Sequence, residues 1–222
     1  MWSTRFANDH RPAILLSGNH DVLTPGVRLE DEVRARGAAH VLSPLASSPD
    51  APAVKAFVGA GAGLAVHEVM KMTDRGPQPF DVTGSRLAEM DPSARFDVWL
   101  THFPLLSFES RCREARLLYS AHLDQLAPPP PVLPGDRGPV VVLSGHLHLR
   151  AVTTEANVLQ LSFAALVEPP YEVATVELDT ERASVAYRCT SVIPSDADRI
   201  PVLDPAGGSW SFGLESGRWS RS

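Results

Sequence analysis

The stretch VVVLSGHLH at residues 140–148 combines the two features around which the rest of the sequence is organised. Its first four residues form an uninterrupted apolar run, which is typical of a β-strand covered on both faces by other layers. A serine, a glycine and two histidines come next, just past the carboxyl end of the predicted strand. In open α/β sheets the ligand crevice lies outside the carboxyl ends of the strands. The stretch therefore predicts an α/β fold with a ligand site at one sheet edge.

Two further segments repeat this pattern, AILLSGNHD at residues 13–21 and FDVWLTHFP at residues 96–104. The histidines that follow the three apolar runs are His20, His102, His146 and His148. Taken singly, each has a plain structural explanation; Gly-Asn-His-Asp, for example, is also a turn sequence. Taken together, they predict that three neighbouring strands bring imidazoles and the Asn19 amide to one crevice. Such donors suit Mn, Fe, Zn or a similar ion.

The ordered set G-N-H-D, a lone strand-end T-H and G-H-L-H resembles the calcineurin-like metallophosphoesterase family, over about residues 13 to 180. The resemblance implies an α/β fold built as a two-sheet β-sandwich flanked by helices, with two divalent metal ions in the complete site. It implies that Asn19, His102 and His146 ligate the second metal and that His148 ligates the first. The metals expected are Mn, Fe or Zn, with two ions in the complete family site and one in a reduced site.

The resemblance also implies a reaction, the metal-dependent hydrolysis of a phosphomonoester or phosphodiester. A metal-activated hydroxide is the nucleophile, and the cations neutralise the phosphoryl oxygens. His20 is implied to be catalytic rather than a ligand, protonating the leaving group, as suits an imidazole that titrates near neutral pH. Asp21 is expected to steady the loop, while Gly18 and Gly145 let the backbone bend where a Cβ would clash. The expected substrate is a phosphorylated small molecule or a nucleotide.

The family pattern also contains D-x-H and G-D-x-x-D, and neither occurs upstream of Asn19. Only His148 then remains for the first metal, and the bridging carboxylate is missing together with the first β-α-β portion of the sheet. Two accounts fit. In the first, Met1 is not the natural start and the chain is an N-terminally truncated phosphoesterase. In the second, it is a degenerate relative with one metal or none that acts as a binding or regulatory module. We favour the first, because the remaining motif residues stand together.

The remaining sequence predicts ordinary α/β elements. Further apolar runs predict strands at Ala13–Leu16, Val98–Leu100, Val158–Leu161, Val173–Leu178 and Ala183–Tyr187. Amphipathic patterns predict helices at 25–37 and 110–127, and PPPPVLPGDRGP at 128–139 predicts an exposed connector. VGAGAGLAV at 58–66 lacks the third glycine of a dinucleotide fingerprint and predicts a turn. We expect a single domain over residues 1–203 and a loosely ordered tail over 204–222, because the sequence from Ile193 on is rich in Pro, Gly, Ser and Asp.

Composition narrows the function classes. With 222 residues and a net charge of -6, the chain lacks the basic excess of a general nucleic-acid or anionic-membrane binder. The sequence shows no secretory leader and no apolar run of membrane-spanning length, and its two cysteines, Cys112 and Cys189, lie far apart. These features predict a cytoplasmic protein with reduced thiols. Arg111, Arg113 and Arg116 form either a phosphate-binding group or a solvated basic helix face.

Overall fold

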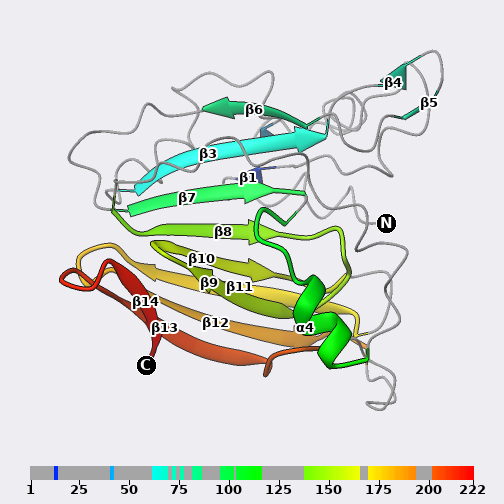
Figure 1. The fold of residues 1–222 in the computed structure, drawn as a ribbon. Helices are drawn as coiled ribbons and strands as arrows, with labels where there is room; N and C mark the ends of the chain where they lie inside the picture. The colour runs from blue at the N-terminus through cyan, green and yellow to red at the C-terminus, as the bar shows by residue number, and fades with distance from the viewer. Residues whose placement is uncertain are drawn as a thin grey trace.

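The computed structural model describes the chain in part. Before residue 96 it describes only six strands. From residue 96 on it describes residues 96–102, 104–116, 138–165, 170–193 and 202–222. The side chains discussed below begin at Asp97. Within these limits the protein is an α/β fold with two strand-rich sheets and little helix (Figure 1).

The larger sheet has six strands in the order β6-β3-β7-β8-β10-β9. The strands are β3 (Ala62–Val69), β6 (Val82–Arg86), β7 (Phe96–Thr101), β8 (Val140–Ser144), β9 (Ala151–Glu155) and β10 (Val158–Ser162). β3, β7, β8 and β10 run parallel, and the edge strands β6 and β9 run antiparallel to their neighbours. The register of the two central strands pairs Thr101 with Ser144. The residues that follow β7 and β8 therefore leave the sheet at the same edge.

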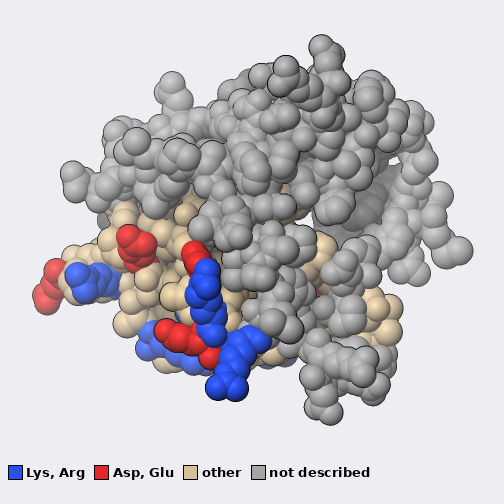
Figure 2. All heavy atoms as spheres, turned by 45° about the vertical axis from the view of Figure 1, so that its right-hand side comes forward, with Lys and Arg blue, Asp and Glu red and all other residues tan. Residues whose placement is uncertain are grey.

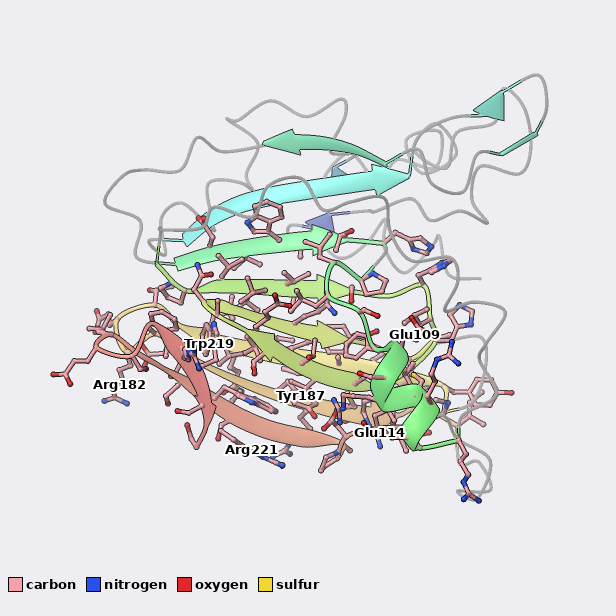
Figure 3. All side chains as sticks on the ribbon, in the orientation of Figure 1. Glu109, Glu114, Arg182, Tyr187, Trp219 and Arg221 are labelled. Carbon is pink, nitrogen blue, oxygen red and sulfur yellow. The ribbon has the colours of Figure 1, made fainter. Side chains whose placement is uncertain are left out.

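The second sheet is an antiparallel meander of four strands in the order β11-β12-β13-β14. The strands are β11 (Glu172–Asp179), β12 (Ser184–Ser191), β13 (Gly207–Gly213) and β14 (Arg218–Arg221). Two short pairs complete the strands, β1 (Ala13–Ile14) with β2 (Val41–Leu42) and β4 (Met72–Thr73) with β5 (Gly76–Pro77). The helix α4 (Glu109–Glu114) lies between β7 and β8 in the chain, and Figure 3 labels both of its end residues.

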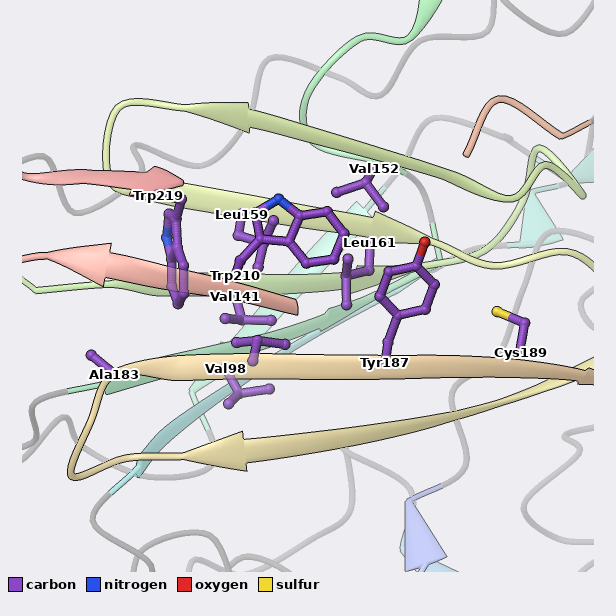
Figure 4. Packing of buried hydrophobic residues seen from close by; sticks show 11 residues of the cluster. Val98, Val141, Val152, Leu159, Leu161, Ala183, Tyr187, Cys189, Trp210 and Trp219 are labelled. Carbon is purple, nitrogen blue, oxygen red and sulfur yellow. The ribbon is translucent and has the colours of Figure 1, made fainter. Parts of the chain in front are cut away.

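The two sheets pack against each other across one hydrophobic core. Val98, Val141 and Leu159 reach it from the six-stranded sheet, and the four-stranded sheet contributes larger side chains (Figure 4). Tyr187 stacks on Trp210 with ring centroids 5.5 Å apart. Buried aromatic rings remove much apolar area from water, and a stacked pair adds a further stabilising contact. The aromatic residues of the second sheet therefore supply much of the apolar surface that the two layers bury between them.

The expectation of a loosely ordered tail over residues 204–222 is wrong. Most of this segment forms β13 and β14, and Trp210 and Trp219 are only 7% and 6% exposed. The indole Nε1 of Trp219 donates to the Asn157 carbonyl at 2.8 Å. The Gly and Ser content suggests a loop. In this segment, however, Trp and Phe alternate with Ser and Gly, and this two-residue period is typical of a strand with one buried face.

The other element predictions can be compared with the structure over the described residues. The strands predicted from Val98 onward are confirmed as β7, β8, β10, β11 and β12, and the first predicted strand is described at Ala13–Ile14. The turn predicted at 58–66 is wrong from Ala62 onward, because β3 begins at that residue. Gly and Ala have low β-propensity, but β3 pairs with β7 on one side and with β6 on the other, and this pairing outweighs the propensity. The helix predicted over 110–127 is described only as α4, which ends at Glu114. The helix predicted at 25–37 and residues 128–137 of the connector lie outside the described residues.

Acidic and basic side chains are interspersed over the described part of the face in Figure 2, and neither sign forms a continuous patch there. This distribution agrees with the modest negative charge of the whole chain. No helix in the described residues has the length and apolar character needed to cross a membrane.

Candidate metal centre

Two of the predicted site histidines meet at the carboxyl edge of the six-stranded sheet. His102 follows β7 directly, and His146 follows β8 after Gly145. The Gly145 amide donates to the His102 carbonyl at 3.1 Å, which extends the pairing of the two strands by one residue. Nδ1 of His146 then lies 3.2 Å from Nε2 of His102, with the ring centroids 5.0 Å apart and the planes 68° from parallel. Parallel pairing of β7 and β8 thus brings these imidazoles together, as the sequence predicts.

The loop that carries His146 and His148 is held in place by two buried leucines, one on either side of His148. Leu147 and Leu149 are buried against Phe108 and Cys112, whereas His146 and His148 are half-buried. The sequence H-L-H-L thus sends its leucines inward. The backbone is left-handed at both histidines, with φ of 64° at His146 and 50° at His148. Such a conformation is uncommon outside glycine and costs free energy; in this structure it also occurs at Arg116, Ala156, Tyr171 and Ala183.

The loop that follows His102 is held by a residue that the sequence analysis did not single out. Gln160 lies in the middle of β10 and is fully buried. Its Oε1 accepts from the amides of Leu105 and Leu106 at 2.6 and 2.7 Å, and its Nε2 donates to the Leu106 carbonyl at 2.8 Å. The signal was a lone amide within the apolar run VLQLS, since a buried polar side chain requires hydrogen-bond partners.

Two of the three arginines considered as phosphate ligands are occupied within the protein. Arg111 forms a two-pronged ion pair with Asp204, at 2.9 and 3.2 Å, and also donates to the Val152 carbonyl. Arg113 donates through Nε to Glu109 one turn earlier in α4, at 2.8 Å. The structure therefore favours a structural role for both side chains.

The cysteines are free thiols, as the sequence predicts, and the structure shows that both are buried. Burial, reinforced by the nearby Glu172 carboxylate, raises the pKa of Cys189 from 9.0 to about 11. Burial also raises the pKa of Cys112, against the opposing charge of Arg111. The thiolate is the form that binds metals and attacks electrophiles, so neither side chain is suited to those tasks at neutral pH.

The remaining predicted site residues are placed only in part. Gly18, Asn19, His20 and Asp21 lie outside the described residues. Over the part of the chain that is described, no three His, Cys, Asp or Glu side chains gather closely enough to hold a metal ion. Of the described candidate ligands, His102 and His146 lie together, and His148 is not grouped with them closely enough to complete a three-ligand site.

Comparisons with protein-family models, with curated protein sequences and with solved structures found no match.

Proposed function

We propose that this protein hydrolyses phosphoesters with divalent metal ions held beside His102 and His146, as a metallophosphoesterase-type enzyme. The observation that carries the proposal is the 3.2 Å approach of His102 Nε2 and His146 Nδ1, which come from two adjacent parallel strands. The order of G-N-H-D, T-H and G-H-L-H along the chain supports the same reading.

The separation of the two ring nitrogens fits a shared metal ion. Two nitrogens bound to one Zn²⁺ at about 2.0–2.1 Å, with a tetrahedral or octahedral angle between them, lie about 2.8–3.4 Å apart. The observed 3.2 Å falls within this interval, and it is also the length of the hydrogen bond that the two imidazoles form without a metal. Imidazole nitrogen is also a donor that Zn, Mn and Fe accept. The pair is therefore suited to supply two ligands to one ion.

Each motif residue has a distinct task in this proposal. His102, His146 and Asn19 would hold the second metal ion, and His148 would be a ligand of the first. When bound, the metal ions supply an activated water and positive charge for the phosphoryl oxygens. His20 holds a proton at its ring and passes it to the leaving oxygen of the ester. Gly18 and Gly145 leave room for the backbone beside the ion, and Asp21 steadies its loop.

A second candidate is a relative that binds one metal or none and serves as a binding or regulatory module. The observation that favours it is that, within the described residues, no third His, Cys, Asp or Glu side chain joins His102 and His146 closely enough to hold a metal ion. The two candidates differ in catalysis, since a module retains the fold without metal-dependent turnover.

Metal content and turnover together test the proposal. After Mn²⁺ loading and desalting, we expect one or two ions per chain by mass spectrometry, and Mn²⁺-dependent hydrolysis of a generic phosphodiester such as bis(p-nitrophenyl) phosphate. His102→Ala and His146→Ala should lower both metal content and turnover. His20→Ala should keep the metal and lower turnover by about 10²–10⁴-fold, the usual contribution of a general acid.

His122→Ala is the matched control, because His122 belongs to none of the three motifs. It should leave both measurements unchanged. Retained metal without any turnover would favour the module, and a chain that neither retains Mn²⁺ nor hydrolyses the diester would contradict the proposal.

A further inference from the structure

Gln160 is a polar side chain at an interior position of the fold. The β10 residues Leu159 and Leu161 face the core shared by the two sheets, so Gln160 faces the opposite side of the six-stranded sheet. The loop formed by Leu105 and Leu106 packs on that side, against Val140 and Val158. The side chain is fully buried, and its three hydrogen bonds to this loop are between 2.6 and 2.8 Å long.

This loop is the continuation of the backbone from His102. On one side of the loop, the His102 carbonyl is bound by the Gly145 amide at the end of β8. On the other, Leu105 and Leu106 are bound by Gln160, 54 to 55 residues later in the chain. His102 therefore lies at the point where the chain leaves β7 and turns back over the sheet, and it is fixed from both directions.

No apolar residue at position 160 can form the hydrogen bonds that Gln160 makes to this loop. With an apolar side chain at position 160, two amides and one carbonyl of the loop would lose their partner in a buried setting. An unmade buried hydrogen bond is costly, so the loop would move to recover partners from water or from other backbone. Because Leu105 follows His102 by three residues in the chain, such a movement would displace His102 as well.

We propose that Gln160 is a positioning residue for His102, setting its spacing to His146 and hence the metal affinity of the pair; this second step rests on the proposed function. Replacing a residue that orients a metal ligand without touching the metal typically lowers metal affinity by about 10–100-fold. Gln160 acts through the backbone rather than through the ring, and its effect on affinity should therefore be at the lower end of that range.

Gln160→Met tests the proposal with a side chain of similar length that lacks the amide. Mn²⁺ affinity, measured by calorimetry on the full chain, should fall by about tenfold. With Co²⁺ as a second probe, the visible absorption spectrum should also change, which reports an altered ligand arrangement rather than a loss of stability. Leu159→Ala is the matched control, since it disturbs the neighbouring residue on the opposite face of β10. It should lower the melting temperature and leave affinity and spectrum unchanged. Wild-type affinity in Gln160→Met would overturn the proposal.

Gln160→Glu provides a rescue that a purely structural role does not predict. A protonated carboxyl group reproduces both the acceptor and the donor of the amide; burial favours this form, whereas the two backbone amides that donate to the side chain favour the ionised one. Once ionised, the side chain loses the donor and faces the Leu106 carbonyl with like charge. The ratio of variant to wild-type Mn²⁺ affinity should therefore be highest at acid pH and fall several-fold as the carboxyl group ionises. A ratio near one at every pH at which the protein is folded would overturn the proposal even if Gln160→Met fails to fold.

A metal-free measurement separates this inference from the proposed function. Wild-type protein that binds neither ion would contradict the proposed function alone. The ring ¹H–¹⁵N signals of His102 and His146 would then decide about Gln160. Signals that shift in Gln160→Met but not in Leu159→Ala would support the positioning role, and unchanged signals would overturn it.

Discussion

At the scale of single residues, Asp204 joins three segments of the protein. Its carboxylate accepts from Arg111 of α4 and from the Val152 amide of β9, the latter at 2.7 Å. Its carbonyl accepts from Arg150 Nε at 3.0 Å. The segment that leads into β13 is thereby attached to the six-stranded sheet, and the Tyr187 hydroxyl adds a hydrogen bond to the next residue, through the Pro205 carbonyl.

Asp204→Ala should lower the free energy of unfolding by about 1–3 kcal/mol, because it leaves a half-buried guanidinium and a buried amide without this partner. Urea denaturation measures the change. The matched control is Arg113→Ala on the same helix, whose ion pair with Glu109 is exposed; such pairs contribute about 0.3–0.5 kcal/mol. Equal losses in the two variants would show that the Asp204 contacts are not stabilising.

The two thiols show at the same scale why residue type alone does not reveal a role. Cysteine is a metal ligand or a nucleophile in some proteins and a small core residue in others. Cys112 and Cys189 lie among apolar side chains of two different core clusters. Because both thiols are surrounded by apolar core side chains, we assign them a packing role.

At the scale of elements, the β13–β14 hairpin closes the core from the C-terminal side. Phe212 and Trp219 pack edge to face with ring centroids 5.5 Å apart. In β13, Gly208 leaves space for the Trp210 ring, because a Cβ at position 208 would lie 2.7 Å from that ring. The hairpin thus depends on two tryptophans that fill the core and on small residues that give them room.

Trp219→Ala should cost about 3–5 kcal/mol, the usual loss for removing a buried aromatic side chain. Trp219→Phe should cost less, because it keeps a ring in the core and gives up the hydrogen bond to Asn157. Leu214→Ala is the control, since Leu214 is 84% exposed in the turn between the two strands and should change stability by less than about 0.5 kcal/mol. Denaturant midpoints of the three variants give the comparison; a small effect of Trp219→Ala would mean that the hairpin is not part of the cooperative fold.

At the scale of the whole molecule, the core between the sheets contains two ionisable groups that remain neutral. Burial, together with the nearby Asp204 and Cys189, raises the pKa of Tyr187 from 10.0 to about 12. Cys189 lies in the same core, with its pKa raised to about 11. Because these groups face the contact between the sheets, their ionisation opposes packing of the whole fold.

We therefore expect an alkaline loss of stability. In the unfolded chain the thiol ionises near its ordinary pKa of 9.0, whereas the folded protein keeps the proton to about 11. Unfolding then releases protons in this interval, so the stabilisation is fully present below pH 9 and is lost as the pH rises to about 11. Urea midpoints measured across this range should fall in the wild type and fall less in Cys189→Ala. Parallel curves for the two proteins would contradict the assignment.

Much of the candidate site can be derived from local sequence. An apolar run followed by one or two small residues and then a histidine predicts both the strand and the histidine at its end, because the two are close together in the chain. The structure bears this out for β7 and β8. Gln160 was missed because its partners are 54 and 55 residues away, so nothing near it in sequence shows what it binds.

The sequence by itself determined the central strands and the residues at their carboxyl ends, since these follow from apolar periodicity and contiguity. Only the tertiary structure decided that β7 and β8 are parallel neighbours, which brings together two imidazoles 44 residues apart. It also decided that a Gly- and Ser-rich tail becomes two strands, because Trp210 and Trp219 are buried only when the opposite sheet is present to cover them. Strand neighbours and burial depend on contacts between distant segments, and local composition does not specify those contacts.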